Sequence, residues 1–269
     1  MIQKDKLVIL VLTNQTKPWS DIFRLGAIPT WISHSRDQVD IYTYTGKKPA
    51  EYYLIRESIT GRLRNSKGRF IQKIIDRRFT GIFNLNLEAQ KVVGKEIFQF
   101  QPEIHSTIGA RTIAAFHAVL SDKDWNYLWR ANVSNYVNVD ALTELLRKLP
   151  QERVAAGVLN SFGELQYLSG AGYLLSRDVV EELLSRKGLW DHAYFDDVAL
   201  GFALRRMGIE LTEIPRMRLT RHDEVHELSL RTLEKMPSFR CNGLDDRRED
   251  ILIMKALHKI LCGVDHLSD

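Results

Sequence analysis

Two adjacent acidic residues, Asp196 and Asp197, are the part of the sequence best suited to acid–base chemistry. They begin the segment FDDVALGFAL at residues 195–204, whose apolar spacing predicts a helix that starts at the pair. A helix N-terminus favours an ionised carboxylate and a neighbouring carboxylate opposes it, so one of the two can serve as a general base. Simple helix capping also explains carboxylates at this position.

A glycine-rich segment precedes the acid pair. Its sequence is SGAGYLLS at residues 169–176, and it is expected to form a turn before a helix. Gly170, Ala171 and Gly172 would let the backbone approach a bound molecule closely and so shape a pocket. Trp190, farther along, offers a flat aromatic face for a ligand, although a tryptophan in this place is often packed in the core.

Strands alternate with helices along most of the chain, which predicts an α/β fold with a mainly parallel sheet. The expected strands cover residues 7–13, 38–45, 96–101, 126–130, 154–158 and 209–214. The expected helices cover residues 21–32, 106–120, 140–149, 177–186 and 196–208. We expect a single domain, 1–269, with a core over 6–215 and a tail over 216–269. The tail is polar and loop-like to residue 244, then helical, and packs on the core.

Composition limits the classes of partner. The chain has 269 residues, 44% of them hydrophobic, and this is enough for a full core without disulfides. A net charge of +4 suits an anionic small ligand, an acidic glycan or an anionic lipid surface, and no nucleic-acid motif is present. The basic stretch over residues 51–79 is expected to be a loop that could face a membrane. No apolar run is long enough to span one, so we expect a cytoplasmic protein, or one peripheral to a membrane.

The two cysteines, Cys241 and Cys262, are too few for a disulfide framework. They also lack any metal-binding spacing, which is consistent with a reducing compartment.

Polar residues follow two of the expected strands. Thr13 and Asn14 come after the first strand, and a polar loop comes after the strand that ends at Arg130. In open α/β sheets ligands bind beyond the carboxyl ends of the strands. We therefore expect these loops and the acid pair to gather around one site.

Three ordered motifs give the chain a family resemblance over roughly residues 6–226. They are VLT at 11–13 with Arg24 and the Thr30–Trp31 pair, then SGAGYLLS, then FDDVALG. Together they resemble the fringe-like and β-1,3-glycosyltransferase group (family 31-like), which has the GT-A fold. The resemblance implies inverting transfer of a sugar from a nucleotide sugar, a UDP-sugar, to a hydroxyl of a glycan or glycolipid. It assigns the catalytic base to Asp197. We expect Asp196 to support this base, and the glycine segment and Trp190 to line the acceptor or sugar pocket.

One motif departs from that group. Its metal-binding Asp-x-Asp is replaced here by Asn132-Val133-Ser134, and Mn²⁺ and Mg²⁺ prefer carboxylate oxygen, so a divalent metal is doubtful. Asn132 and Ser134 would still contact the nucleotide, with Thr13 and Asn14. Positive charge for the diphosphate would come from four arginines, Arg111, Arg130, Arg240 and Arg247. His222 is the nearest match to the metal histidine of the group, and a surface histidine is the alternative.

Two other functions stay open. One is a non-catalytic sugar- or nucleotide-binding relative of the same fold, which the missing Asp-x-Asp favours. The other is a nucleotidyltransferase, which would need a glycine-rich basic loop after the first strand. That loop is TNQTK at residues 13–17, with one lysine and no glycine. The sequence does not indicate the donor sugar, the acceptor or the oligomeric state.

Overall fold

The computed structural model describes residues 6–35, 37, 39–47, 90–103, 105–121, 125–186, 188–244 and 247–263. The basic stretch over residues 51–79 lies outside these ranges. Within them, no helix combines the length and the apolar character needed to cross a membrane.

A mixed sheet of eight strands forms the centre of the described structure, in the order β3-β4-β2-β1-β5-β8-β7-β9. The strands are β1 Leu7–Leu12, β2 Asp40–Lys47, β3 Gln90–Val93, β4 Glu96–Pro102, β5 Tyr127–Asn132, β7 Ala155–Phe162, β8 Leu165–Ser176 and β9 Leu211–Glu213. β1 is parallel to both β2 and β5, β2 to β4, and β7 to β9. β8 is antiparallel to β5 and β7, and β3 to β4. This confirms the predicted α/β class.

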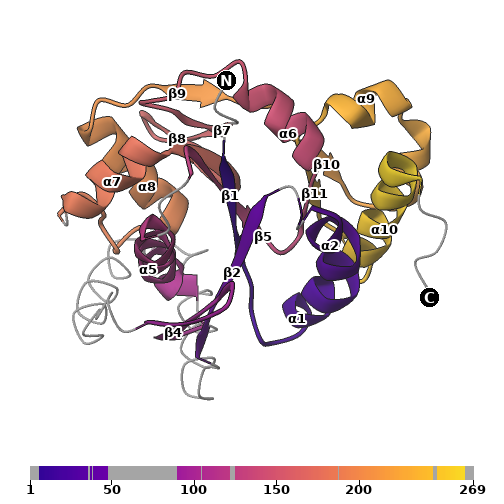
Figure 1. The fold of residues 1–269 in the computed structure, drawn as a ribbon, viewed down its shortest axis with the longest axis horizontal. Helices are drawn as coiled ribbons and strands as arrows, with labels where there is room; N and C mark the ends of the chain where they lie inside the picture. The colour runs from indigo at the N-terminus through magenta and orange to yellow at the C-terminus, as the bar shows by residue number, and fades with distance from the viewer. Residues whose placement is uncertain are drawn as a thin grey trace.

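Helices cover both faces of the sheet (Figure 1). One face carries α5 Ile108–Leu120, α7 Arg177–Ser185 and α8 Asp196–Arg206. The other carries α1 Trp19–Asp21, the π-helical η1 Ile22–Ile32, α2 Ser33–Ser35, α6 Val139–Leu146 and α10 Glu249–Cys262. Because both faces are covered, β1 is apolar at every position, as a central strand must be.

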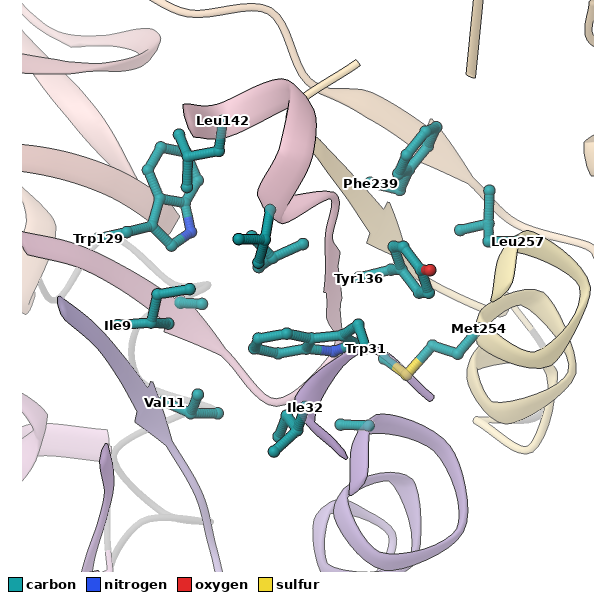
Figure 2. Close-up of a cluster of buried hydrophobic side chains, with 14 of the residues drawn as sticks. Ile9, Val11, Trp31, Ile32, Trp129, Tyr136, Leu142, Phe239, Met254 and Leu257 are labelled. Atoms are coloured by element: carbon teal, nitrogen blue, oxygen red, sulfur yellow. The ribbon is translucent and has the colours of Figure 1, made fainter. Parts of the chain in front are cut away.

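Successive residues of β1 enter two separate hydrophobic clusters. Val8 and Leu10 pack with α5, α7 and α8, whereas Ile9 and Val11 pack with η1, α6 and α10. Figure 2 shows the second cluster, in which Ile9 and Val11 lie beside Trp31 and other apolar side chains. The sheet is thereby held rigidly between two cores, and its strand ends are fixed in place.

The C-terminal part of the chain differs from the prediction of a loop-like tail up to residue 244. It forms β10 Met217–Leu219, the 3₁₀ helix η3 Asp223–Glu227, α9 Leu230–Lys235 and β11 Ser238–Cys241. β10 and β11 join β6 Asn135–Val137 in a three-stranded sheet. Its strands have only three or four residues, so their buried side chains, such as Phe239, make no visible pattern. The predicted C-terminal helix is confirmed as α10.

The glycine segment is not a turn, and this corrects the sequence expectation. It lies inside β8, where it forms a bulge: from Gly157–Tyr173 to Leu159–Leu168 the pairing advances two residues on β7 but five on β8. We call residues 169–172 the glycine bulge. A bulge re-aims the backbone without ending the strand. Residues 169–172 are unpaired with β7, whereas Gly172 stays paired with Ala131 of β5 and β8 continues to Ser176.

Candidate functional site

A cavity of about 340 Å³ opens at the carboxyl ends of β1 and β5. Leu12 at the end of β1 is paired with Asn132 at the end of β5, because the two strands are parallel. The residues that follow the strands, Thr13 and Asn14 on one side and Ser134 on the other, therefore line the same cavity. This is the edge of an open α/β sheet where ligands bind.

Arg240 on β11 supplies positive charge to this cavity. Its Nη1 donates to the Ser134 hydroxyl and, at 3.3 Å, to Oδ1 of Asn135. Burial, with the neighbouring Arg247 and Arg216, lowers the pKa of Arg240 to about 10. No carboxylate in the described part of the chain forms an ion pair with Arg240. A guanidinium held without a counter-ion is suited to an anionic ligand.

A second arginine, Arg111 on α5, also lines the cavity and is 2% exposed. Burial lowers the pKa of Arg111, while the nearby Tyr44, Glu103 and Asp196 act to raise it. Glu103 lines the cavity, and Asp196 belongs to the acid pair. The charge of Arg111 thus acts on both parts of the site.

Glu103 is the only carboxylate among the described residues that line the cavity. Its Oε2 accepts from the Gln15 backbone N–H at 2.9 Å. Its Oε1 accepts from the Thr45 hydroxyl and, at 3.2 Å, from the Gly46 N–H. The two oxygens thus link Gln15, in the loop after β1, to Thr45 and Gly46 of β2.

The cavity does not fit a hard divalent cation. Mg²⁺ and Mn²⁺ favour several oxygen ligands, carboxylates above all. Here the positions after β5 carry an amide, Asn132, and a hydroxyl, Ser134, which accepts a hydrogen bond from Arg240. A guanidinium at that position repels a cation. His222 lies elsewhere, with Nδ1 3.0 Å from Glu249, and is not one of the residues that line the cavity.

The acid pair occupies the first turn of α8, as predicted. Asp197 is half-buried, and each of its two oxygens accepts a hydrogen bond from a backbone N–H. Oδ2 accepts from Gly170 at 3.1 Å, and Oδ1 accepts from Val198 at 2.9 Å. Burial raises the pKa of Asp197, and the charge of Asp196 raises it further, against the effect of these two N–H groups. The carboxyl is therefore ionised less readily than a free aspartate.

Arg130 on β5 holds the acid pair and the glycine bulge together. Its guanidinium is buried, with Nη2 3.2 Å from Oδ2 of Asp196 and Nε 3.0 Å from the Tyr44 hydroxyl. Nη1 donates to the Gly170 carbonyl. Arg130, which was predicted to contact a donor, does not line the cavity, and its side chain is engaged with the protein.

Close packing explains the two glycines of the bulge. A Cβ on Gly170 would lie 3.1 Å from Oδ2 of Asp197, and one on Gly172 would lie 3.0 Å from Nδ2 of Asn135. The space beside each glycine is therefore filled by a polar side chain of the protein itself, Asp197 or Asn135. The sequence suggested that a bound ligand would fill it.

The other two bulge residues, Ser169 and Ala171, contact polar side chains. Nη1 of Arg216 lies 3.1 Å from the Ser169 hydroxyl, and Nδ2 of Asn135 donates to the Ala171 carbonyl at 2.8 Å. Asn135 also contacts Arg240, so the bulge is linked to the cavity.

Neither Asp196 nor Asp197 lines the cavity, although both are described. The two parts of the site are nevertheless neighbours. His105, a cavity residue, packs edge-on against Phe195, which directly precedes the acid pair, with 4.9 Å between ring centres. The cavity and the acid pair are therefore neighbours, linked by the contact of His105 with Phe195 and by the contacts of Asn135 with Arg240 and the glycine bulge.

Two predicted site residues, Trp190 and Arg247, do not line the cavity. Trp190 is 7% exposed and belongs to a hydrophobic cluster, where it packs on Gly109, so it offers no face to a sugar. The guanidinium of Arg247 lies 4.8 Å from the ring centre of Trp19, a residue that does line the cavity. It also lies 2.6 Å from Asp250, with which it forms an ion pair.

Sequence reasoning missed Arg216, His105, Trp19 and Glu103. No local pattern marks Arg216, which reaches the site through a contact distant in sequence, whereas Trp19 and His105 lie close in sequence to the ends of β1 and β4. Glu103 follows β4, and its place at a strand end was a usable signal.

No protein-family model matches the chain, and no curated protein matches its sequence. Solved structures do match. The galactosyltransferase LgtC in complex with donor and acceptor sugar analogs is 11% identical, covers 97% of this chain and 98% of its own, and has a TM-score of 0.42. A glycosyltransferase involved in glycosylation of the major capsid of PBCV-1 is 8% identical, with coverages of 92% and 98% and a TM-score of 0.45. The 4-diphosphocytidyl-2C-methyl-D-erythritol synthase of Anaerococcus prevotii is 7% identical, with coverages of 79% and 88% and a TM-score of 0.41. Because these TM-scores are below 0.5, function is argued from the geometry of the site.

Proposed function

We propose that the chain is a GT-A-type glycosyltransferase that moves a sugar from a UDP-sugar to a hydroxyl of a glycan or glycolipid. One observation carries the proposal. The cavity at the ends of β1 and β5 holds Arg240, which forms no ion pair with any carboxylate among the described residues, and it lies near a carboxylate with a raised pKa, Asp197. A site for an anionic leaving group next to a base is what transfer from a nucleotide sugar needs.

The donor would occupy the cavity. Thr13, Asn14 and Asn132 offer hydrogen-bonding groups for the nucleoside, and Trp19 offers an aromatic wall. Arg240 would bind the diphosphate, since a guanidinium matches phosphate oxygens in a bidentate fashion. The charge that develops on the leaving diphosphate would then be stabilised by protein cations without a metal.

Asp197 would remove the proton from the acceptor hydroxyl while that oxygen attacks the anomeric carbon. Direct attack on the face opposite the leaving group inverts the configuration, so the proposed reaction is inverting. Burial and Asp196 shift the pKa of Asp197 upward, which strengthens it as a base once it is ionised. The acceptor would approach over the glycine bulge, where Ser169 and Arg216 can hold sugar hydroxyls.

A role in polysaccharide biosynthesis, a cytoplasmic location and a peripheral membrane contact stay predictions. The basic residues that suggested the membrane contact, within residues 51–79, lie outside the described ranges.

A non-catalytic nucleotide-sugar-binding protein is a second candidate, and a specific observation favours it. Both oxygens of Asp197 already accept backbone hydrogen bonds, and the residue does not line the cavity. Such a protein would bind donors in the same place and would never release the free nucleotide from them.

A thermal-shift screen of nucleotide sugars, each with Mn²⁺ and with EDTA, tests the proposal. A ligand that binds only the folded state raises Tm, and we expect UDP-sugars to do so equally in both conditions. Arg240→Met should remove the shift. Arg218→Met is the matched control, because Arg218 pairs with Arg240 across β10 and β11 but is exposed. No shift with any nucleotide sugar would contradict the proposal, and a shift with CTP alone would favour a nucleotidyltransferase.

A further inference from the structure

Two helices from opposite ends of the chain bring three metal-binding side chains together, away from the site described above. His34 belongs to α2, whereas His258 and Cys262 stand four residues apart on α10. That spacing places both on one face of the helix. The ligand atoms of all three residues lie within 4.8 Å of one another.

Tyr136 on β6 contacts two of these residues from inside the protein. Its hydroxyl lies 3.1 Å from Nδ1 of His258 and 4.0 Å from Sγ of Cys262. Tyr136 is buried in a hydrophobic cluster, and Figure 2 shows its hydroxyl on the side of α10. A hydrogen bond to one nitrogen of a histidine orients the ring and leaves the other nitrogen for a metal. Nε2 of His258 is the nitrogen that Tyr136 does not use.

A second cavity, of about 190 Å³, adjoins the three residues. His34, Cys262 and Tyr136 line it, and so do two acidic residues, Asp140 and Glu234. The cavity gives an ion a way in and room for a water molecule. The two acidic residues add negative charge along that route.

We propose that His34, His258 and Cys262 form a site for a borderline-soft divalent cation of the Zn²⁺ class. Two imidazoles and a thiolate select Zn²⁺ over Mg²⁺, Ca²⁺ and Mn²⁺, which prefer oxygen. Three protein ligands leave a fourth tetrahedral position, which a water in the cavity fills. On binding, the Cys262 thiol releases its proton to solvent.

Closing on the ion takes only side-chain movement. Bonds of about 2.0–2.3 Å place tetrahedral ligand atoms roughly 3.3–3.7 Å apart, somewhat closer than the 4.8 Å limit found here. His34 is exposed and can rotate, while α10 and Tyr136 hold the other two ligands. The bound ion links α2 to α10, so it stabilises the packing of the C-terminal helix on the N-terminal segment.

Spectroscopy with Co²⁺ on the metal-stripped full chain tests the site. Co²⁺ should produce tetrahedral d–d bands together with a thiolate charge-transfer band, and Zn²⁺ should remove both. Cys262→Ser should abolish the charge-transfer band, because Cys241, the other thiol, is fully buried elsewhere. A charge-transfer band that persists in Cys262→Ser, or no tetrahedral spectrum at all, would overturn the proposal.

Calorimetry with Zn²⁺ gives an independent measurement. The wild type should bind one equivalent, and His34→Ala should weaken binding at least tenfold. Tyr136→Phe, which keeps the packing, should weaken it by about 10- to 100-fold. His226→Ala removes an exposed histidine outside the cluster and should change nothing. Equal affinity in His34→Ala and His226→Ala would overturn the proposal. UDP binding should be the same in all these variants, so this test is independent of the proposed transferase function.

Discussion

Nη2 of Arg130 lies 3.2 Å from Oδ2 of Asp196, and the two side chains are 1% and 10% exposed. This nearly buried ion pair joins the central strand β5 to the first turn of α8. The same guanidinium donates to the carbonyl of Gly170, and the backbone N–H of Gly170 donates to Asp197. The position of the proposed base is therefore set by an arginine that the sequence had assigned to the donor.

Loss of the buried arginine should be costly. In Arg130→Met the Asp196 carboxylate stays buried without its partner, and breaking such a pair costs about 3–5 kcal/mol. Urea unfolding measures the change in free energy. Arg186→Ala, which breaks the exposed pair with Glu182, is the control and should cost about 0–1 kcal/mol. Similar costs for the two variants would contradict a structural role for Arg130.

The raised pKa of Asp197 should make stability and activity depend on pH in opposite directions. A carboxyl whose pKa is higher in the folded state contributes stability that is complete below its unfolded pKa. That contribution is lost as pH rises through the folded pKa. Transfer needs the ionised base, so its rate should rise over the same range. Urea unfolding and UDP release at a series of pH values check both directions. In Asp197→Asn the pH dependence of stability and that of the rate of UDP release should both become weaker. If both stay as in the wild type, Asp197 is not the titrating group.

Arg240 should account for most of the affinity for diphosphate. A hydrogen bond to a charged group contributes about 1.5–3 kcal/mol, so Arg240→Met should weaken UDP binding roughly 10- to 100-fold. Arg240→Lys should recover only part of the loss, because an ammonium lacks the planar fork of guanidinium. Calorimetry in EDTA measures the affinity, with Arg218→Met as the control. Equal affinity in Arg240→Met and the wild type would place the anion elsewhere.

Gly170 should tolerate no side chain. The Cβ of Gly170→Ala would lie 3.2 Å from the Asp197 Cβ and 3.1 Å from its Oδ2, so the carboxylate must move. Overpacking of this kind costs about 1–3 kcal/mol, and UDP release should fall more than UDP binding. At Gly188 an added Cβ meets nothing within 4 Å, so Gly188→Ala is the matched control. An active, fully stable Gly170→Ala would show that the bulge does not position Asp197.

Local patterns were sufficient to predict most of the fold. The unbroken apolar run of β1 marked a strand buried on both faces, and helical spacing marked α8 with its acid pair. The sequence also predicted that Thr13 and Asn132 lie near each other, because the carboxyl ends of neighbouring parallel strands lie at one edge of the sheet.

Contacts between distant residues could not be predicted in this way. Two close glycines are typical of a turn, and only the side chains that fill their Cβ positions show why Gly170 and Gly172 lie in a bulge. The small sheet of β6, β10 and β11 has strands too short to show a period. His34 and Cys262 are 228 residues apart, so no spacing rule connects them.

Release of UDP from UDP-sugars in the presence of EDTA, with water as the acceptor, tests the central claim most directly. The wild type should release UDP without metal. Asp197→Asn should do so about 10²- to 10⁴-fold more slowly, with the same UDP affinity and a folded structure. Release at equal rates from both proteins, or only when Mn²⁺ is supplied, would contradict metal-free catalysis by Asp197.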